Sequence, residues 1–244
     1  MNIAYQLARV GHRVDGTLLT LLVLLSLVPP FLFALYVRSR ERHDREPLRA
    51  VVGAFLWGSS IGVIVAVVLH EVFAFGYAAS GSGLAVSPDF VAAVIAAPIV
   101  EELAKGFGLR GPRRHIWELE DGIVYGAAIG LGFAATENLV YGMVALFDGG
   151  FGLAFGTVAI RVFSAMLLHA AASAMVGFGY GRMMLGVGSF GQLLGFYLLA
   201  VALHAAYNFL VGAGVAYGLV MAIVLVAVVM GAMRRTIEKL DASW

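Results

Sequence analysis

Ionisable and amide side chains inside long apolar segments are the residues of this sequence best suited to chemistry. They fall in four successive segments: Glu101, Glu102 and Lys105; Glu137 and Asn138; Arg161, His169 and Ser173; and His204 and Asn208. An ionisable group in the hydrocarbon region of a bilayer is costly, so its default interpretation is functional. Three pairs share a four-residue spacing that places both members on one helix face: Glu101 with Lys105, His169 with Ser173, and His204 with Asn208.

Carboxylates and imidazoles together predict a site that binds and activates water. Glu101 and Glu102 are adjacent, so their side chains point about 100° apart on a helix and only one faces the site directly. Lys105 can neutralise Glu101 or extend to the membrane interface. Six residues are predicted to be catalytic and three to support them: Glu101, Glu102, Glu137, His169, His204 and Asn208, with Lys105, Asn138 and Ser173 in support.

The residue types also suggest individual roles. Glu101 is the expected general base for the attacking water, with Glu102 and Lys105 tuning it. The set expected to bind a metal or to position the water consists of Glu137, His169 and His204. These ligand types suit zinc, and the absence of cysteine excludes thiolate sites. A desolvated glutamate can also work without a metal, so both versions stay open, and no other cofactor is expected.

Other polar residues have structural interpretations. The amide of Asn208 suits either an oxyanion or a hydrogen bond between helices. His70 and Glu71 are expected at the outer membrane interface, and Asp121 as a helix N-cap. Arg161 is expected to reach the interface or to pair with a helix end.

Composition identifies the environment of these residues. Of 244 residues, 61% are hydrophobic and 13% are charged, against roughly a quarter charged in a soluble domain, and the mean hydropathy is +0.92. These values exclude a soluble globule and predict an integral membrane protein. The formal net charge of +1 gives no basic field for nucleic acid. We expect one all-α polytopic domain over residues 1–244, with a motif-bearing core at about 90–211.

Apolar runs of about 20 residues predict seven membrane-spanning helices. They lie near Thr17 to Val37, Ala50 to Phe73, Phe90 to Phe107, Gly122 to Phe147, Phe155 to Gly181, Gln192 to Val211 and Val215 to Met233. The third to the sixth of these carry the polar residues and form the predicted catalytic core. On straight helices Glu101 lies roughly 9 Å from the cytoplasmic end of its span and Glu137 about 22 Å from the start of its own. Tilt or a displaced third span must bring them to one depth.

The distribution of lysine and arginine predicts the orientation, because cytoplasmic loops retain positive charge. The basic residues on one side are Arg38, Arg40, Arg42, Arg45, Arg49, Arg110, Arg113, Arg114, Arg182, Arg234, Arg235 and Lys239. Only Arg9 and Arg13 fall on the other side. We therefore expect the N-terminus outside and the C-terminus in the cytoplasm of a bacterial or archaeal cell.

Four motifs in this order resemble the PrsW family of intramembrane proteases. They are Glu101-Glu102-Leu-Ala-Lys105, Phe133-Ala-Ala-Thr-Glu137-Asn138, His169-Ala-Ala-Ala-Ser173 and His204-Ala-Ala-Tyr-Asn208, and Asp121-Gly122-Ile-Val-Tyr125-Gly126 also fits. The resemblance covers about Pro98 to Phe209. Related CAAX-processing and bacteriocin-immunity membrane proteases usually have histidine where Glu137 stands, so their substrate choice is not carried over.

The resemblance implies hydrolysis of peptide bonds in or beside the membrane. The best-known role of the family is site-1 cleavage of a membrane-anchored anti-sigma factor, so the expected partner is a single-span membrane protein within the lipid bilayer, and no nucleic acid. The resemblance leaves open whether the enzyme is a metalloprotease or a metal-free glutamate protease. The alternative is a proton-coupled transporter or channel that uses the same glutamates and histidines as a relay. Against it, the halves show no inverted repeat.

Overall fold

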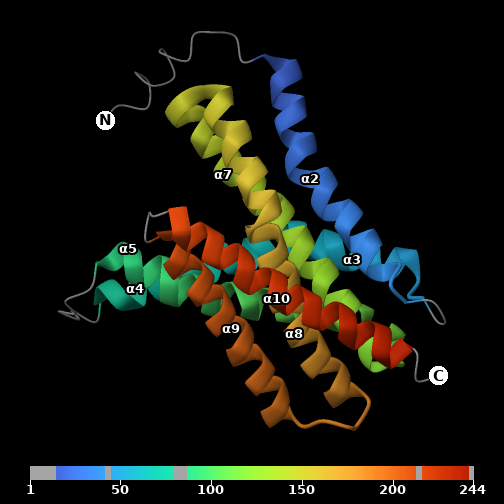
Figure 1. Cartoon of the computed structure of the whole chain (residues 1–244). Helices are drawn as coiled ribbons and strands as arrows, with labels where there is room; N and C mark the ends of the chain where they lie inside the picture. Colours follow the sequence, from blue (N-terminus) through green and yellow to red (C-terminus); the bar gives the residue numbers. More distant parts are fainter. Residues whose placement is uncertain (1–14, 42–44, 80–86, 213–215, 242–244) are drawn as a thin grey trace.

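The protein is helical throughout the part of the chain that the structure describes (Figure 1). The structure is a computed structural model, and it describes residues 15–41, 45–79, 87–212 and 216–241. No strand forms within these ranges, which confirms the all-α prediction. Arg9, Arg13 and Arg42, which enter the charge distribution, lie outside the described residues.

The elements follow one another with short connections. In chain order they are α2 (Gly16–Arg38), α3 (Leu48–Trp57), the π-helical η1 (Gly58–Gly62), α4 (Val63–Ala79), α5 (Pro88–Phe90), the π-helical η2 (Val91–Ala96), α6 (Ala97–Phe107), the short 3-10 turns η3 (Gly108–Arg110) and η4 (Pro112–His115), α7 (Leu119–Phe163), α8 (Ala165–Met184), α9 (Phe190–Gly212) and α10 (Ala216–Asp241).

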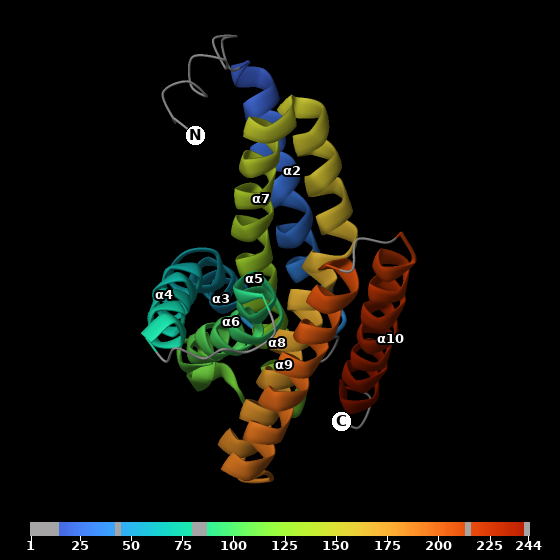
Figure 2. The ribbon, with the colours of Figure 1, turned by 90° about the vertical axis from the view of Figure 1, so that its left-hand side faces the viewer.

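Five helical stretches among the described residues are long and apolar enough to cross a membrane. They are Gly16–Arg38, Leu48–Tyr77, Leu119–Met184, Phe190–Gly212 and Gly218–Thr236. The third stretch contains two of the predicted spans, because the chain reverses within α7 at Gly149 and Gly150, whose backbone is not helical. Figure 2 shows α7 rising, turning and descending again. The protein is thus a polytopic membrane protein, and the count of seven spans stays a prediction.

The third predicted span differs most from expectation. Residues 90–107 form a helical path that η2 interrupts before α6, so they are not one regular helix. Pro98 lacks the N–H that would bond to the carbonyl of Val94, and a wider π-helical turn precedes it. Figure 2 shows α6 crossing α7 at a steep angle rather than running beside it. The carboxylates of α6 therefore approach α7 from the side.

The core lies where α7 and α8 pack closely together. A Cβ atom added to Gly126 would lie 2.3 Å from the Ser173 carbonyl oxygen, and one added to Gly130 would lie 2.1 Å from that of His169. Only residues without a side chain allow two helix backbones this near to each other. This close packing fixes the position of His169 relative to α7.

Candidate active site

Five of the six predicted catalytic residues converge from four helices. Glu101 and Glu102 come from α6, Glu137 from α7, His169 from α8 and His204 from α9. Because α6 crosses α7 at a steep angle, Glu101 and Glu137 line one cavity. The sequence thus identified residues that the fold brings together from widely separated positions.

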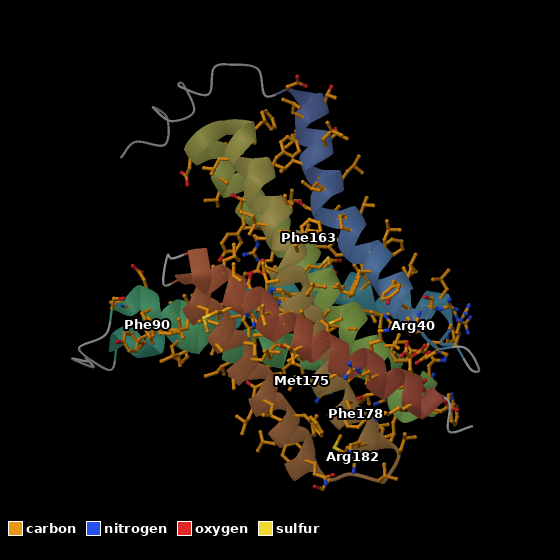
Figure 3. The ribbon with its side chains drawn as sticks, viewed as in Figure 1. Arg40, Phe90, Phe163, Met175, Phe178 and Arg182 are labelled. Atoms are coloured by element: carbon orange, nitrogen blue, oxygen red, sulfur yellow. The ribbon has the colours of Figure 1, made fainter. Side chains whose placement is uncertain are left out.

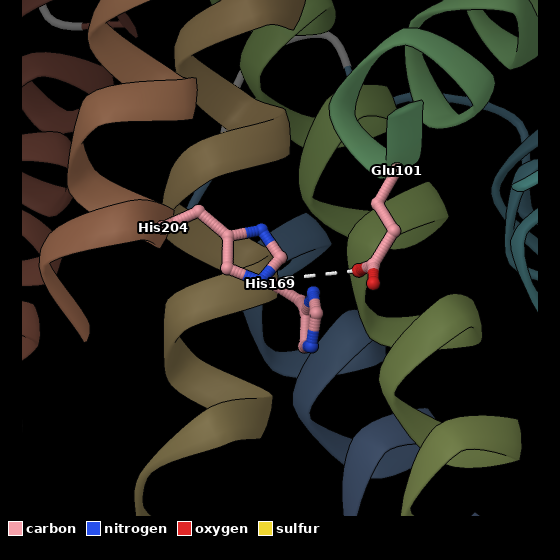
Figure 4. A group of neighbouring side chains, drawn as sticks. All are labelled: Glu101, His169 and His204. Atoms are coloured by element: carbon pink, nitrogen blue, oxygen red, sulfur yellow. Dashed lines mark ion pairs between the residues drawn. The ribbon is translucent and has the colours of Figure 1, made fainter. Parts of the chain in front are cut away.

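Glu101, His169 and His204 form the most compact group (Figure 4). One nitrogen or oxygen atom from each residue lies within 4.8 Å of the other two. Glu101 Oε2 lies 3.8 Å from His204 Nε2. The two imidazole rings are perpendicular, with their centroids 5.0 Å apart. Glu101 Oε2 is buried without a hydrogen-bond partner, so this oxygen is available to a ligand.

Glu102 is fully buried and orients the residues around it. Its Oε1 accepts from Lys105 Nζ and lies 2.8 Å from His204 Nδ1, while Oε2 accepts from the Ser173 hydroxyl. Lys105 therefore pairs with Glu102, three residues earlier, and not with Glu101 as one sequence interpretation suggested. Because Glu102 holds His204 Nδ1, the other ring nitrogen, Nε2, is directed at Glu101.

Lys105 also fixes the protonation of His169. Its ammonium lies 3.0 Å from His169 Nδ1. A lysine ammonium has only donors, so Nδ1 accepts and the ring proton sits on Nε2. That proton is directed at Glu137 Oε2, 2.6 Å away. A chain of contacts thus links Glu102 to Glu137 through Lys105 and His169.

Arg161 completes the surroundings of Glu137, which sequence reasoning did not predict. Its Nη2 lies 2.7 Å from Glu137 Oε2, and its Nε donates to Asn138 Oδ1 at 3.0 Å. The guanidinium stacks 3.9 Å from the centre of the Tyr141 ring. Arg161 therefore lies in the site and not at the membrane interface. The signal available in the sequence was an arginine inside the apolar segment that follows the one with Glu137.

Asn208 lies apart from this group. Its Nδ2 donates to the Ala93 carbonyl at 2.8 Å and joins α9 to η2. This is the interhelical hydrogen bond that the sequence allowed as one interpretation. The amide keeps a second N–H, but the side chain lines a different cavity from Glu101 and Glu137, so the oxyanion role stays a prediction.

Two cavities reach the carboxylates from different sides. One of about 300 Å³ lies between α4, α6 and α7 and is lined by both Glu101 and Glu137. His70 and Glu71 of α4 also line it. These two residues, which the sequence placed at the membrane interface, therefore also form part of the wall of the site. Another, of about 420 Å³, reaches Glu102 between α6, α8 and α9. Of these two cavities, only the first is lined by two of the candidate carboxylates, Glu101 and Glu137.

The donor set fits a zinc ion in part. Two ligands of a tetrahedral zinc lie roughly 3.4 Å apart, close to the 3.8 Å between Glu101 Oε2 and His204 Nε2. Glu102 behind His204 gives the carboxylate–histidine arrangement common around metals. His169 can join as a third ligand only if Nε2 loses the proton that it shares with Glu137.

Comparison with known proteins decides between the functional classes. The model of the PrsW family of intramembrane metalloproteases matches residues 46–233, a range that includes all four motifs. The chain belongs to this family. It is therefore an integral membrane peptidase, and this membership favours proteolysis over the transporter alternative. No solved structure matches the chain.

Three relatives named protease PrsW show how far the similarity extends. The protein of Clostridioides difficile (strain 630) is 33% identical over 123 residues, 49% of this chain and 50% of that protein. That of Geobacillus kaustophilus (strain HTA426) is 28% identical over 204 residues, 82% of this chain and 84% of the relative. That of Bacillus subtilis (strain 168) is 28% identical over 160 residues, 64% and 66% of the two chains.

Proposed function

We propose that this chain is an intramembrane endopeptidase whose attacking water lies between Glu101 and His204. The observation that carries the proposal is the unpartnered, buried Glu101 Oε2, 3.8 Å from His204 Nε2, beside a cavity that Glu137 also lines. Two atoms at this distance can both hydrogen-bond to one water molecule that lies beside them. Peptide hydrolysis needs water that hydrocarbon excludes, and the cavity supplies a path for it.

In this proposal each residue has a defined task. Glu101 is the general base that takes the proton of the attacking water. Glu102 and Lys105 hold His204 and His169 in their orientations through the contacts described above. Glu137 is the second carboxylate at the cavity. Arg161 holds it there, and its Oε2 accepts a hydrogen bond from His169 Nε2.

A zinc ion in the site would be held by Glu101, His169 and His204. This set replaces the expected Glu137 by Glu101, because Glu137 already bonds to His169 and Arg161. When bound, zinc lowers the pKa of a water molecule toward 7 and polarises the substrate carbonyl. In that case Glu137 is the carboxylate left to accept the proton, because Glu101 is occupied as a ligand.

The proposed substrate is a single-span membrane protein such as a membrane-anchored anti-sigma factor, cut at site 1. The cavity beside Glu101 and Glu137 is bounded by α4, whose outward residues Val67 and Val72 are exposed and apolar. A substrate helix can therefore approach along a lipid-facing surface and unwind at its end to reach the carboxylates. With the N-terminus outside, we propose a cut on the extracytoplasmic flank of the substrate.

Purified protein incubated with a single-span substrate tests the catalytic assignment. Glu101→Gln is expected to abolish cleavage, and Glu137→Gln and His169→Ala to reduce it at least 100-fold, because each removes a group at the reacting water. Glu238→Gln, an acid outside the site that pairs with Arg234 and Arg40, is the matched control that keeps the reaction. If folded Glu101→Gln, Glu137→Gln and His169→Ala all cleave at the unmutated rate, the assignment is wrong. Mass spectrometry of the products locates the cut.

Elemental analysis of protein purified without chelator tests the metal. One zinc per chain, lost in His204→Ala, together with inactivation by chelator and recovery with zinc, is expected of the metalloprotease version. Full activity in chelator with far less than one metal per chain would support the metal-free glutamate mechanism instead.

A further inference from the structure

The cavity of about 420 Å³ between α6, α8 and α9 has two arginines in its wall. Arg110 and Arg113 line it just beyond the end of α6, and the last turns of α8 and the first turns of α9 form the rest of the wall. Arg182, near the end of α8, marks this end of the molecule in Figure 3. This space, the arginine-lined cavity, has no task in the reaction proposed above.

Most of the other residues that line the arginine-lined cavity are apolar. Among them Phe107, Phe190 and Leu194 are 36%, 70% and 44% exposed. Leu194 and Phe190 belong to α9, which is long and apolar enough to cross the membrane. Exposed apolar side chains of such a helix contact lipid. The cavity therefore opens toward hydrocarbon, where an acyl chain is the apolar molecule at hand.

The two arginines keep their hydrogen-bond donors free. Both side chains are exposed, and neither has an ion pair or a hydrogen bond with the part of the chain that the structure describes. The Arg110 guanidinium lies 5.0 Å from the centre of the Phe107 ring, a contact that engages no hydrogen-bond acceptor. The N–H fork of a guanidinium matches two oxygens of a phosphate group. The wall thus combines an apolar surface with two free phosphate-binding groups.

The arginine-lined cavity is poorly suited to the substrate of the active site. Of the candidate catalytic residues, Glu102 alone lines it, and both Glu102 oxygens already accept hydrogen bonds, from Lys105 and Ser173. Glu101 and Glu137 line the other cavity. In the orientation that the charges predict, the arginines lie on the cytoplasmic side, where a single-span substrate is also basic and would be repelled. The lipids of that leaflet carry the opposite charge.

We propose that the arginine-lined cavity binds one anionic phospholipid, with its phosphate at Arg110 and Arg113 and an acyl chain against the apolar wall. Basic pockets between membrane helices on the cytoplasmic side are suited to acidic lipid head groups. Trp117, four residues after Arg113, is 73% exposed, and tryptophan is enriched at the level of the head groups. This places the arginines at the depth of a lipid phosphate.

Native mass spectrometry of the full-length chain in detergent tests the site by titration with phosphatidylglycerol or with phosphatidylcholine of the same acyl chains. One phosphatidylglycerol per chain is expected to bind at least 10-fold more tightly than phosphatidylcholine, because each arginine near an anionic head group contributes about fivefold. Arg110→Gln with Arg113→Gln is expected to remove this preference. Arg234→Gln with Arg235→Gln, which removes the same charge from exposed positions on α10, is the control that keeps it.

A cavity-filling variant tests the apolar part of the site without a change of charge. Gly106 lines the cavity, and a Cβ atom added there would meet only Val176 Cγ1, at an ordinary 3.5 Å. Gly106→Leu therefore extends into the space of the acyl chain and is expected to weaken phosphatidylglycerol binding at least 10-fold. Gly195→Leu, on α9 with nothing within 4 Å of its Cβ position, is the control.

Competition distinguishes the lipid from other occupants. Inorganic phosphate at millimolar concentration is expected to leave phosphatidylglycerol bound, because it lacks the acyl chain. The proposal is wrong if phosphatidylcholine binds as tightly as phosphatidylglycerol, or if the arginine variant or Gly106→Leu binds like the unmutated chain. Displacement by inorganic phosphate alone, or by a single-span substrate, would also contradict it and make the cavity a site for a free anion or for the substrate.

Discussion

Arg161 illustrates how one residue positions a carboxylate of the proposed active site. It supplies the only guanidinium contact to Glu137 among the described residues and also fixes Asn138, next in sequence. The planar fork makes both contacts at once, which a single ammonium group does not reproduce. Arg161 is therefore a positioning residue for Glu137.

Substitution of Arg161 is expected to slow cleavage in a graded way. A hydrogen bond to a charged group contributes about 1.5–3 kcal/mol, so Arg161→Gln should lower kcat/KM about 10- to 100-fold. Arg161→Lys, which keeps the charge but not the fork, should fall between Arg161→Gln and the unmutated chain. Arg182→Gln, whose guanidinium bonds to the Val187 carbonyl, should cleave normally. Equal rates for all four proteins would exclude a role for Arg161 in positioning Glu137.

Residue type and depth were enough to identify the catalytic candidates, but not their pairs. Glu101, Glu137 and His204 stand out because lipid does not tolerate them without a purpose. Which partner Lys105 takes depends on whether its side chain reaches three or four residues back, and both are allowed on a helix. Asn208 offered two uses, and only the position of Ala93 on η2 shows which one the fold adopts.

At the scale of elements, the close approach of α7 and α8 fixes the position of His169, a proposed catalytic residue. Gly130 faces the backbone of His169 with no room for a side chain. Packing and catalysis are therefore coupled along this helix pair, since a shift of α8 moves His169 away from Lys105 and Glu137.

Gly130→Ala is expected to lower both stability and activity. The added methyl group would lie 2.1 Å from the His169 carbonyl oxygen, and overpacking of this kind typically costs about 1–3 kcal/mol. Gly156→Ala is the matched control, because nothing lies within 4 Å of its Cβ position. Thermal unfolding and cleavage rates, measured side by side, test this. Unchanged Tm and activity in Gly130→Ala would mean that α7 and α8 separate without cost.

Hydropathy predicted most helices correctly, because a long apolar segment in a bilayer must satisfy its own backbone hydrogen bonds and a helix does so. It did not predict the break in residues 90–107. A composition window measures how apolar a segment is, whereas the break arises from the missing N–H of Pro98 and the π-helical turn before it. In the sequence, Pro98 and the depth conflict between Glu101 and Glu137 were the signs of the unusual path of α6.

At the scale of the whole molecule, the orientation remains a prediction from charge. The turn at Gly149 and the connection between α8 and α9 lie at opposite ends of the descending arm (Figure 2). Arg182 lies in the last turn of α8, next to the second of these, and no lysine or arginine adjoins the first, so the first is expected outside. The absence of cysteine makes a direct test simple.

Single cysteines introduced at exposed positions test the orientation. Asp148→Cys is expected to react with a membrane-impermeant maleimide added to intact cells, and Ser189→Cys only after the membrane is permeabilised. Cleavage of the substrate by both variants shows that they fold. The reverse labelling pattern would place the N-terminus in the cytoplasm and move the proposed cut to the opposite flank.

The reversal at Gly149 and Gly150 also affects how the chain enters the membrane during synthesis. Its two arms carry Glu137 and Arg161, 24 residues apart. A lone charged residue at the centre of an inserting helix costs about 2.5–3.5 kcal/mol on insertion scales. A hairpin that leaves the translocation machinery in one step carries an ion pair in place of two lone charges. The two arms are therefore expected to enter lipid together, before the helix bearing His204 has left the ribosome.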